Sequence, residues 1–182
     1  MTIIVLDRDG VVNREVEGGC RSADDWTPLP GSIEAMAELS QAGYQLAIAT
    51  NQPGLARGWF DLDDLEAMHA KMRALVEDAG GEVAGIFYCP HDAVDNCRCR
   101  KPATGLLDVI EAEFDTSLHD CYFVGDRLRD LQAAVAKGCK PVLVRTGRGE
   151  ETVLELISNP DASLSQTAVF DDLGQFSKFI LQ

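Results

Sequence analysis

Two aspartates spaced one residue apart follow the first apolar segment of the chain. Residues 3–6 are Ile-Ile-Val-Leu, and they lead directly into Asp7, Arg8, Asp9 and Gly10. An uninterrupted apolar run that ends at a glycine predicts a strand buried on both faces of a sheet. Ligands of open α/β sheets bind outside the carboxyl ends of the strands, where both aspartates are expected. An isolated Asp-x-Asp is more typical of a capped turn, but directly after a buried strand the two carboxylates favour a cation.

Polar residues of the same kind follow two further apolar segments. Thr50 and Asn51 come after residues 45–49, and Asp126 comes after the segment that ends at Val124 and Gly125. Parallel strands bring their carboxyl ends to one edge of a sheet, so these side chains are expected to converge with the first two aspartates. Three carboxylates there are suitable oxygen ligands for Mg²⁺, whereas the hydroxyl and the amide suit anionic oxygens.

Phosphoryl transfer is the chemistry that this combination favours. Lys101 adds a positive charge to the three aspartates Asp7, Asp9 and Asp126. Phosphoryl transfer needs a nucleophile, a metal, and cationic or hydrogen-bonding groups that hold the equatorial oxygens. An aspartate can itself be the nucleophile, because it can form an aspartyl-phosphate that water then cleaves.

A second metal site is predicted in the segment 89–99. Its four potential ligands are Cys89, His91, Cys97 and Cys99. Three thiolates and one imidazole form a closed tetrahedral set that suits Zn²⁺. No separate domain surrounds these residues, so the ion is expected to be structural, holding the loop and directing the residues that follow it. The other three cysteines, Cys20, Cys121 and Cys139, are expected to be ordinary or buried thiols.

Apolar strand patterns and helical patterns alternate along the chain. Strands are predicted at residues 3–6, 45–49, 84–88, 121–124, 141–144 and 168–170. Helices are predicted from Ser32 to Gly43, from Asp61 to Asp78, at 106–114, 128–137 and 150–157, and from Asp172, with Ser32 as the first N-cap. The alternation predicts an α/β fold with a doubly wound parallel sheet, in one domain of residues 1–182. The segments between the strands are too short for a large cap domain.

The charge of the chain restricts its partners. The net charge of −14 argues against a general binder of nucleic acid or of anionic membranes. No apolar stretch approaches the ~20 residues of a membrane span, and no signal peptide precedes the first strand, so a cytoplasmic protein is expected. No sequence pattern indicates a dimer, so a monomer is expected. Five cations crowd two short loops and suit a small anionic ligand: Arg98, Arg100, Lys101, Arg127 and Arg129.

Taken together, the motifs resemble those of a known superfamily. The four segments are Asp7-Arg8-Asp9-Gly10, Thr50-Asn51-Gln52, Lys101 and Gly125-Asp126-x-x-x-Asp130. In this order they are similar to the four motifs of the haloacid dehalogenase (HAD) superfamily of phosphatases. The resemblance covers most of the chain, and it implies that Asp130 supports the site rather than contacting the substrate.

The resemblance also implies roles for the individual residues. Asp7 is expected to attack phosphorus, and Asp9 to protonate the leaving alkoxide and then activate water. Mg²⁺ is expected to be held by the carboxylates of Asp7 and Asp126 and by the backbone carbonyl of Asp9. Thr50 and Lys101 are expected to hold the phosphoryl oxygens.

The cysteine loop narrows the resemblance to two families within the superfamily. Cys-Pro-His followed by Cys-x-Cys-Arg-Lys-Pro is similar to the heptose bisphosphate phosphatases of lipopolysaccharide-precursor synthesis and to the histidinol-phosphate phosphatases. Residues 50–58 and the Arg-Thr-Gly sequence at 145–147 are closer to the heptose family, although Pro53 stands where that family usually has serine. The resemblance implies four substrate-binding residues: Asn51, Gln52, Arg100 and Arg127.

The expected reaction is therefore the Mg²⁺-dependent removal of the 7-phosphate of D-glycero-D-manno-heptose 1,7-bisphosphate. Hydrolysis of histidinol phosphate is an alternative with the same chemistry. A non-catalytic, phosphate-binding module like a receiver domain is an alternative of a different class. The sequence leaves open which anomer at the sugar's C1 phosphate is preferred.

Overall fold

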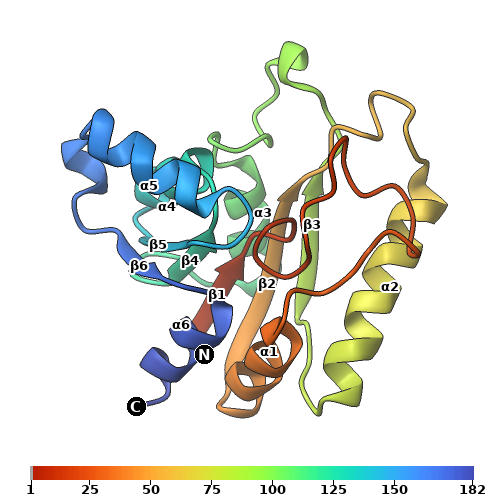
Figure 1. Ribbon diagram of the computed structural model, residues 1–182, viewed down its shortest axis with the longest axis horizontal. Helices are drawn as coiled ribbons and strands as arrows, with labels where there is room; N and C mark the ends of the chain where they lie inside the picture. The colour runs from red at the N-terminus through yellow and green to blue at the C-terminus, as the bar shows by residue number, and fades with distance from the viewer. Residues whose placement is uncertain (1) are drawn as a thin grey trace.

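The protein folds around one six-stranded sheet, described here by a computed structural model of residues 2–182 (Figure 1). The strands are β1 (Thr2–Leu6), β2 (Tyr44–Asn51), β3 (Gly85–Cys89), β4 (Tyr122–Gly125), β5 (Lys140–Val144) and β6 (Ala168–Phe170). The helices are α1 (Ser32–Gln41), α2 (Leu62–Asp78), α3 (Gly105–Phe114), α4 (Leu128–Lys137), α5 (Gly149–Ser158) and α6 (Leu173–Ile180), with short 3₁₀ helices η1 (Ala93–Asp95) and η2 (Ala162–Leu164). The strands are parallel in the order β3-β2-β1-β4-β5-β6, which confirms the predicted doubly wound fold.

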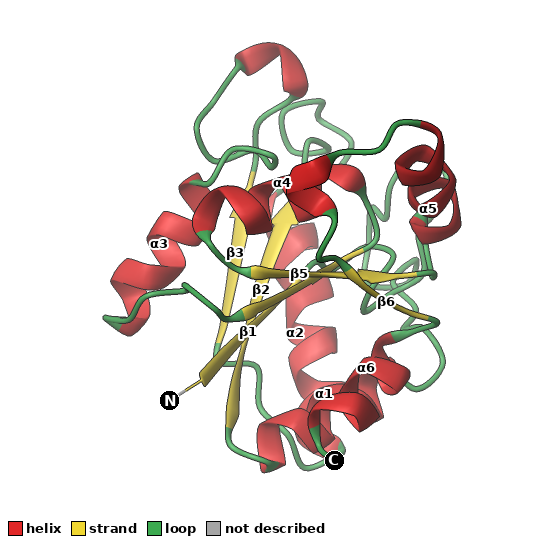
Figure 2. Cartoon of the chain, turned by 90° about the vertical axis from the view of Figure 1, so that its left-hand side faces the viewer, coloured by secondary structure: helices red, strands yellow, loops and turns green. Residues whose placement is uncertain are grey.

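Strand β1 lies at the centre of the sheet and is buried on both faces. Ile4 and Leu6 pack in a cluster with side chains of α1, α2 and α6, whereas Ile3 and Val5 pack in a second cluster with side chains of α3 and α4. This division explains why the segment is apolar at every position instead of alternating. Figure 2 shows the helices on either side of the strands.

The register of the strands brings the predicted site residues to one edge. Leu6 pairs with Ile48 of β2 and with Val124 of β4, so the first residue after β1 lies level with the ends of its two neighbours. Strand β2 is longer than predicted, because Thr50 and Asn51 still pair with β3. These two residues therefore sit in rigid strand backbone and not in the turn that follows.

One predicted helix cap is wrong. Ser32 is the first residue of α1, and Gly31, in the left-handed conformation, occupies the N-cap position. The Ser32 hydroxyl donates hydrogen bonds to the carbonyls of Val12 and Leu29, at 2.6 and 2.9 Å, so it ties the helix to the preceding loop. The predicted start of α2 is confirmed, since Asp61 caps that helix.

No cap domain interrupts the sheet within residues 2–182. A loop and α1 connect β1 to β2, and α2 alone connects β2 to β3. The excursion after β3, which carries η1, rises above the sheet at the top of Figure 1. None of the helices in the described residues combines the length and apolarity that crossing a membrane requires.

Candidate active site

The centre of the site is a lysine surrounded by aspartates. Lys101 is almost completely buried, and its Nζ atom lies 2.9 Å from Asp7 Oδ1 and 2.8 Å from Asp130 Oδ1. The same ammonium group donates to the carbonyl of Ala49 at 2.7 Å. Oxygens of Asp7, Asp126 and Asp130 all lie within 4.8 Å of one another. One buried cation therefore faces three buried carboxylates.

This imbalance of charge perturbs the carboxyl groups. Burial and the nearby Asp130 charge raise the pKa of Asp7 from 3.8 to about 6, although Lys101 acts in the opposite direction. Burial, and then the charges of Asp7 and Asp130, raise the pKa of Asp126 well above its usual value. Such shifts are typical of a site that receives a further cation.

The contacts of Asp126 indicate where a divalent cation fits. Its Oδ2 atom accepts a hydrogen bond from the backbone N–H of Arg148 at 2.8 Å, whereas its Oδ1 atom is buried without a partner among residues 2–182. The backbone at Gly10 and Gly147 approaches this carboxylate so closely that a Cβ atom at either position would overlap it. Both glycines also have positive φ angles, of 89° and 57°. An unpartnered oxygen in a set of carboxylates fits Mg²⁺, which prefers such hard ligands.

Asp130 differs from the other two carboxylates, because one of its oxygens forms an ion pair, although without a hydrogen bond, and the other accepts a hydrogen bond. Oδ1 is paired with Lys101, and Oδ2 accepts from the backbone N–H of Arg127 at 3.0 Å as part of the capping box of α4. These contacts place Asp130 beside Lys101 and the start of α4, and its supporting role stays a prediction.

Asp9 is held by Arg8 and Asn13, to which the sequence assigned no role, and by Gln52, which was expected to bind substrate. One nitrogen of Arg8, Nη2, lies 3.0 Å from both carboxylate oxygens, and Asn13 and Gln52 donate to the same group at 2.9 and 2.8 Å. Burial raises the pKa of Asp9, but the charge of Arg8 and these hydrogen bonds outweigh it, so the pKa is lowered. Asp9 is therefore a carboxylate here, ready to accept a proton.

Arg8 is fully buried and is itself supported by a histidine on α2. Its Nη1 atom lies 3.3 Å from His69 Nε2. Burial and the positive charges of Arg8 and Arg73 lower the pKa of His69 to about 3, so the imidazole is neutral. Since the guanidinium can only donate, Nε2 is the acceptor and Nδ1 carries the proton. The sequence feature that could have revealed this contact is the position of His69 on the apolar face of α2, between Leu65 and Met72.

The three polar residues at the end of β2 hold other site residues. Gln52 Nε2 donates to Thr50 Oγ1 at 2.9 Å as well as to Asp9, so it connects the two predicted catalytic side chains. Asn51 accepts from the backbone N–H of Lys101 at 3.0 Å and donates to its carbonyl at 3.1 Å. Both ends of the Asn51 amide are thus engaged in positioning the lysine, although the sequence analysis expected it to bind substrate.

An open cavity of about 340 Å³ lies above these groups. Its wall includes Asp9, Asn51, Gln52 and the two arginines expected to bind substrate, Arg100 and Arg127. The guanidinium of Arg100 donates to a backbone carbonyl of the cysteine loop at 3.4 Å. Arg127 forms an ion pair with Glu15, from the loop after β1. The cavity is large enough for a sugar and carries the positive charge that phosphate groups require.

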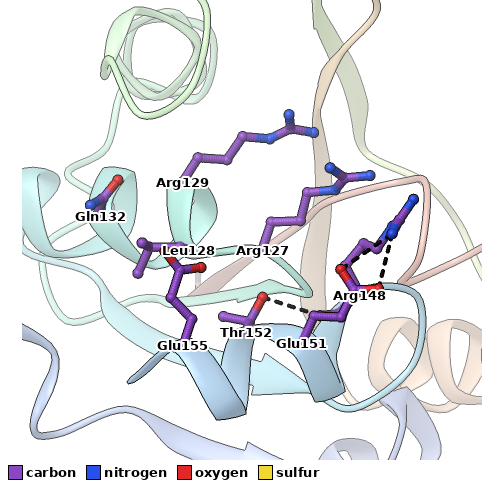
Figure 3. A pocket seen from close by; sticks show the side chains of 8 residues that line it. All are labelled: Arg127, Leu128, Arg129, Gln132, Arg148, Glu151, Thr152 and Glu155. Carbon is purple, nitrogen blue, oxygen red and sulfur yellow. Dashed lines mark hydrogen bonds and ion pairs between the residues drawn. The ribbon is translucent and has the colours of Figure 1, made fainter. Parts of the chain in front are cut away.

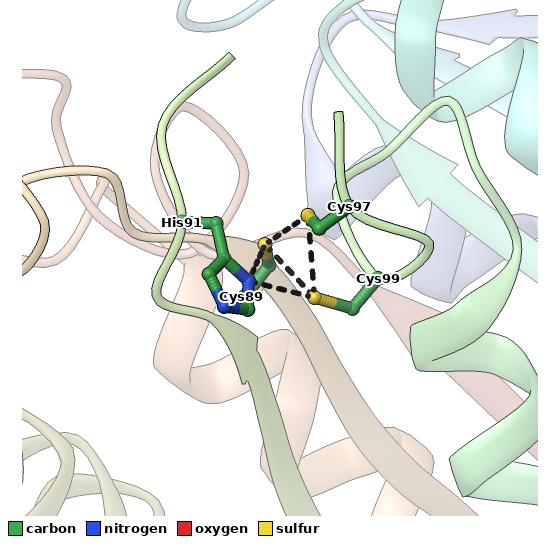
Figure 4. A group of neighbouring side chains, drawn as sticks. All are labelled: Cys89, His91, Cys97 and Cys99. Carbon is green, nitrogen blue, oxygen red and sulfur yellow. Dashed lines mark hydrogen bonds between the residues drawn. The ribbon is translucent and has the colours of Figure 1, made fainter. Parts of the chain in front are cut away.

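The predicted zinc ligands form a compact cluster (Figure 4). Cys99 Sγ lies 3.2 Å from Cys89 Sγ, 3.5 Å from Cys97 Sγ and 3.2 Å from His91 Nδ1. Zn–S bonds of about 2.3 Å imply ligand separations of roughly 3.6–3.8 Å in a tetrahedron, close to those found. Burial raises the pKa of the Cys89 thiol to about 12, so this cluster needs a cation to hold its thiolates. These four residues fit one structural Zn²⁺.

The cluster positions the loop that carries Arg100 and Lys101. The last of its ligands, Cys99, is directly followed by the two cations. The loop is also joined to the segment after β2 by Arg57, which donates to both oxygens of Asp92 at 2.6 and 2.7 Å. Fixing Cys99 therefore fixes the backbone from which Lys101 enters the site.

Comparison with known proteins agrees with this geometry. A family model described as HAD-hydrolase-like matches residues 98–176, which include Lys101, Asp126 and Asp130. The chain is 47% identical over 182 residues to the D-glycero-beta-D-manno-heptose-1,7-bisphosphate 7-phosphatase of Neisseria meningitidis, covering 100% of this chain and 96% of the relative. It is 48% identical to the Pseudomonas aeruginosa protein of the same name, with 100% and 98% covered.

A solved structure is equally similar over the full length. The D,D-heptose 1,7-bisphosphate phosphatase of B. bronchiseptica, complexed with magnesium and phosphate, superposes with a TM-score of 0.94. It is 44% identical and covers 100% of this chain and 99% of that one. The chain belongs to the D-glycero-beta-D-manno-heptose-1,7-bisphosphate 7-phosphatase family of HAD-like phosphatases.

Proposed function

We propose that this protein removes the 7-phosphate of D-glycero-β-D-manno-heptose 1,7-bisphosphate in an Mg²⁺-dependent reaction. The observation that carries the proposal is full-length similarity, at 44–48% identity, to relatives that bear this name. The aspartate cluster and the cavity lined by arginines are the chemistry that such a substrate needs. A receiver-like binding module has less support, because the family consists of phosphatases.

The reaction proceeds through Asp7. Its Oδ1 atom accepts from the backbone N–H of Arg8 at 2.8 Å and pairs with Lys101, which leaves Oδ2 to attack phosphorus. The P–O bond to the sugar breaks, and Asp9, a carboxylate in the free protein that must first take up a proton from solvent, gives that proton to the leaving alkoxide. Asp9, now the carboxylate, takes a proton from water, whose oxygen attacks phosphorus and releases Asp7 and inorganic phosphate.

Asp7 and Asp126, with the Asp9 carbonyl, would hold Mg²⁺, which supplies positive charge to the phosphoryl oxygens. Lys101 and the Thr50 hydroxyl hold the same oxygens from the protein side. Because Lys101 is already ion-paired in a buried position, its ammonium group needs little reorganisation when charge develops on the phosphoryl group.

Phosphate release is the direct test. The assay compares the β and α anomers of heptose 1,7-bisphosphate with histidinol phosphate, each with and without Mg²⁺. We expect the highest kcat/KM for the β anomer, and no activity above background for Asp7→Asn. A preference for histidinol phosphate would overturn the substrate but not the chemistry. Release that persists in the Asp7 variant would refute the nucleophile.

We also propose that the protein works as a cytoplasmic monomer. The six cysteines are all free thiols, and the three cysteines of the Cys₃His cluster need a reducing compartment to remain ligands. Cell fractionation and light scattering test the location and the mass. Recovery from an oxidising compartment, or a dimeric mass at micromolar concentration, would contradict this part of the proposal.

A further inference from the structure

A second cavity of about 560 Å³ adjoins the active-site cavity, between the first turn of α4 and the helix α5 (Figure 3). The two cavities share three lining residues, and all three are arginines: Arg127, Arg129 and Arg148. None of the residues that surround Asp7, such as Thr50 and Lys101, lines the second cavity. The junction of the two cavities, formed by these three arginines, is therefore a positively charged site separate from the reacting centre.

Two of the three arginines at the junction are neutralised by the protein itself. Arg127 pairs with one oxygen of Glu15, and Arg148 Nε lies 3.0 Å from the other. Arg148 also pairs with Glu151 at 2.9 Å. Glu15 thus bridges two guanidinium groups with a single carboxylate, and the junction retains a net positive charge.

The remaining charge belongs to Arg129. It is half-buried, forms no ion pair among residues 2–182, and its Nε atom is buried without a hydrogen-bond partner. Figure 3 shows that the side chains of Arg129 and Arg127 extend in the same direction from the start of α4, so both guanidinium groups lie on the same side of that helix.

A buried guanidinium nitrogen without a partner is costly, so this one requires explanation. A phosphate group can accept two parallel hydrogen bonds from one guanidinium, and it would supply the negative charge that no nearby carboxylate of residues 2–182 gives to Arg129. The proposed substrate has two phosphates, and only one reacts at Asp7. The other must lie away from the reacting centre, in a place with available positive charge.

We propose that Arg129 is a further substrate-binding residue, whose guanidinium holds the second, non-reacting phosphate at the junction of the two cavities. This inference rests on the proposed function and adds a specificity residue to it. Arg129 then makes the enzyme prefer a bisphosphate over a monophosphate, because the monophosphate offers nothing for it to bind.

The test compares the holoenzyme and its variants on two substrates, heptose 1,7-bisphosphate and heptose 7-phosphate. For Arg129→Gln we expect KM for the bisphosphate to rise by about 10-fold to 100-fold, as for loss of a charged hydrogen bond. The kinetics on the 7-phosphate should stay within about 2-fold, because this substrate has no second phosphate for Arg129 to bind. Lys178→Gln, which removes one cation in the last turn of α6, is the matched control and should change neither substrate.

Arg129→Lys retains the charge and loses the planar fork, so its KM for the bisphosphate should lie between those of wild type and Arg129→Gln. This variant also decides the question if the glutamine variant does not fold. An equal loss of kcat on both substrates would show that Arg129 acts on Asp7 instead, and an unchanged KM for the bisphosphate would overturn the inference outright. Failure of the proposed function is visible separately, as wild-type enzyme that does not turn over the bisphosphate.

Discussion

Replacing Asp7 by asparagine should abolish catalysis and yet stabilise the metal-free protein. The two side chains have nearly the same shape, and the asparagine oxygen can still accept from the Arg8 backbone N–H and from Lys101. What the substitution removes is one of three buried negative charges around a single lysine. Lys101 keeps its ion pair with Asp130 and its hydrogen bond to Ala49.

The size of the effect follows from the pKa of Asp7. It is about 6 in the folded protein against 3.8 for the unperturbed group, and burial is the main cause. Below about pH 4 the Asp7 carboxyl is protonated in both the folded and the unfolded protein, so it does not change the free energy of unfolding. As the pH rises to 6 and above, its ionisation lowers the free energy of unfolding by about 3 kcal/mol. Asparagine does not ionise, so the variant should be more stable by about 3 kcal/mol at pH 8, and by about half as much at pH 5.

Urea unfolding followed by circular dichroism measures this difference, in Mg²⁺-free buffer with the zinc content of each protein matched. Asp24→Asn, an exposed carboxylate in the loop before α1, is the control and should change the free energy of unfolding by less than about 0.5 kcal/mol. Adding Mg²⁺ should narrow or reverse the difference, because the ion stabilises only the folded state that binds it. An asparagine variant that is no more stable than wild type at pH 8 would refute the charge argument.

Three further predictions concern other parts of the site. Asp9→Asn should lower kcat by about 10²-fold to 10⁴-fold with an unchanged circular dichroism spectrum, and a kcat within a factor of two would exclude the acid–base role. Cys97→Ser should lose the zinc, expected at about one ion per chain, and lower the melting temperature; metal analysis that still finds one tightly held ion would contradict the closed site. Gly147→Ala should weaken Mg²⁺ activation, because the added Cβ would overlap the Asp126 carboxylate. Gly58→Ala is the control: its φ is similarly positive but a Cβ there meets open space, so the substitution should cost only about 1 kcal/mol of stability. Equal effects of the two substitutions on the Mg²⁺ dependence would show that backbone strain alone is responsible.

The parts of the site that were predicted correctly share a physical origin. A strand that is apolar at every position must be central, and parallel strands must end at the same edge, so the convergence of Asp7 and Asp126 follows from local pattern alone. The cysteine loop was equally readable, because its ligands are close in sequence and their chemistry is specific. The expected roles of these residues in catalysis remain predictions until the variants are measured.

The parts that were missed depend on partners far apart in the chain. His69 supports Arg8 from α2, and Asn51, which also lines the cavity, holds the backbone of Lys101 with both ends of its amide. Ser32 is not the cap because Gly31 occupies the N-cap position, and the Ser32 hydroxyl instead donates to the carbonyls of Val12 and Leu29. In each case the side chain had several possible hydrogen-bond partners, and only the packed structure selected one.

The sequence by itself determined the fold class, the edge of the sheet at which the aspartates converge and the clustering of the four cysteine-loop side chains, because periodicity and ligand spacing are local properties. Only the tertiary structure decided the charge balance of the site. Ion pairs form between groups that folding brings together, so no spacing along the chain reveals that Glu15 pairs with Arg127 and Arg148, whereas Arg129 has no carboxylate partner among residues 2–182. That difference among three neighbouring arginines is the basis of the proposed second phosphate site.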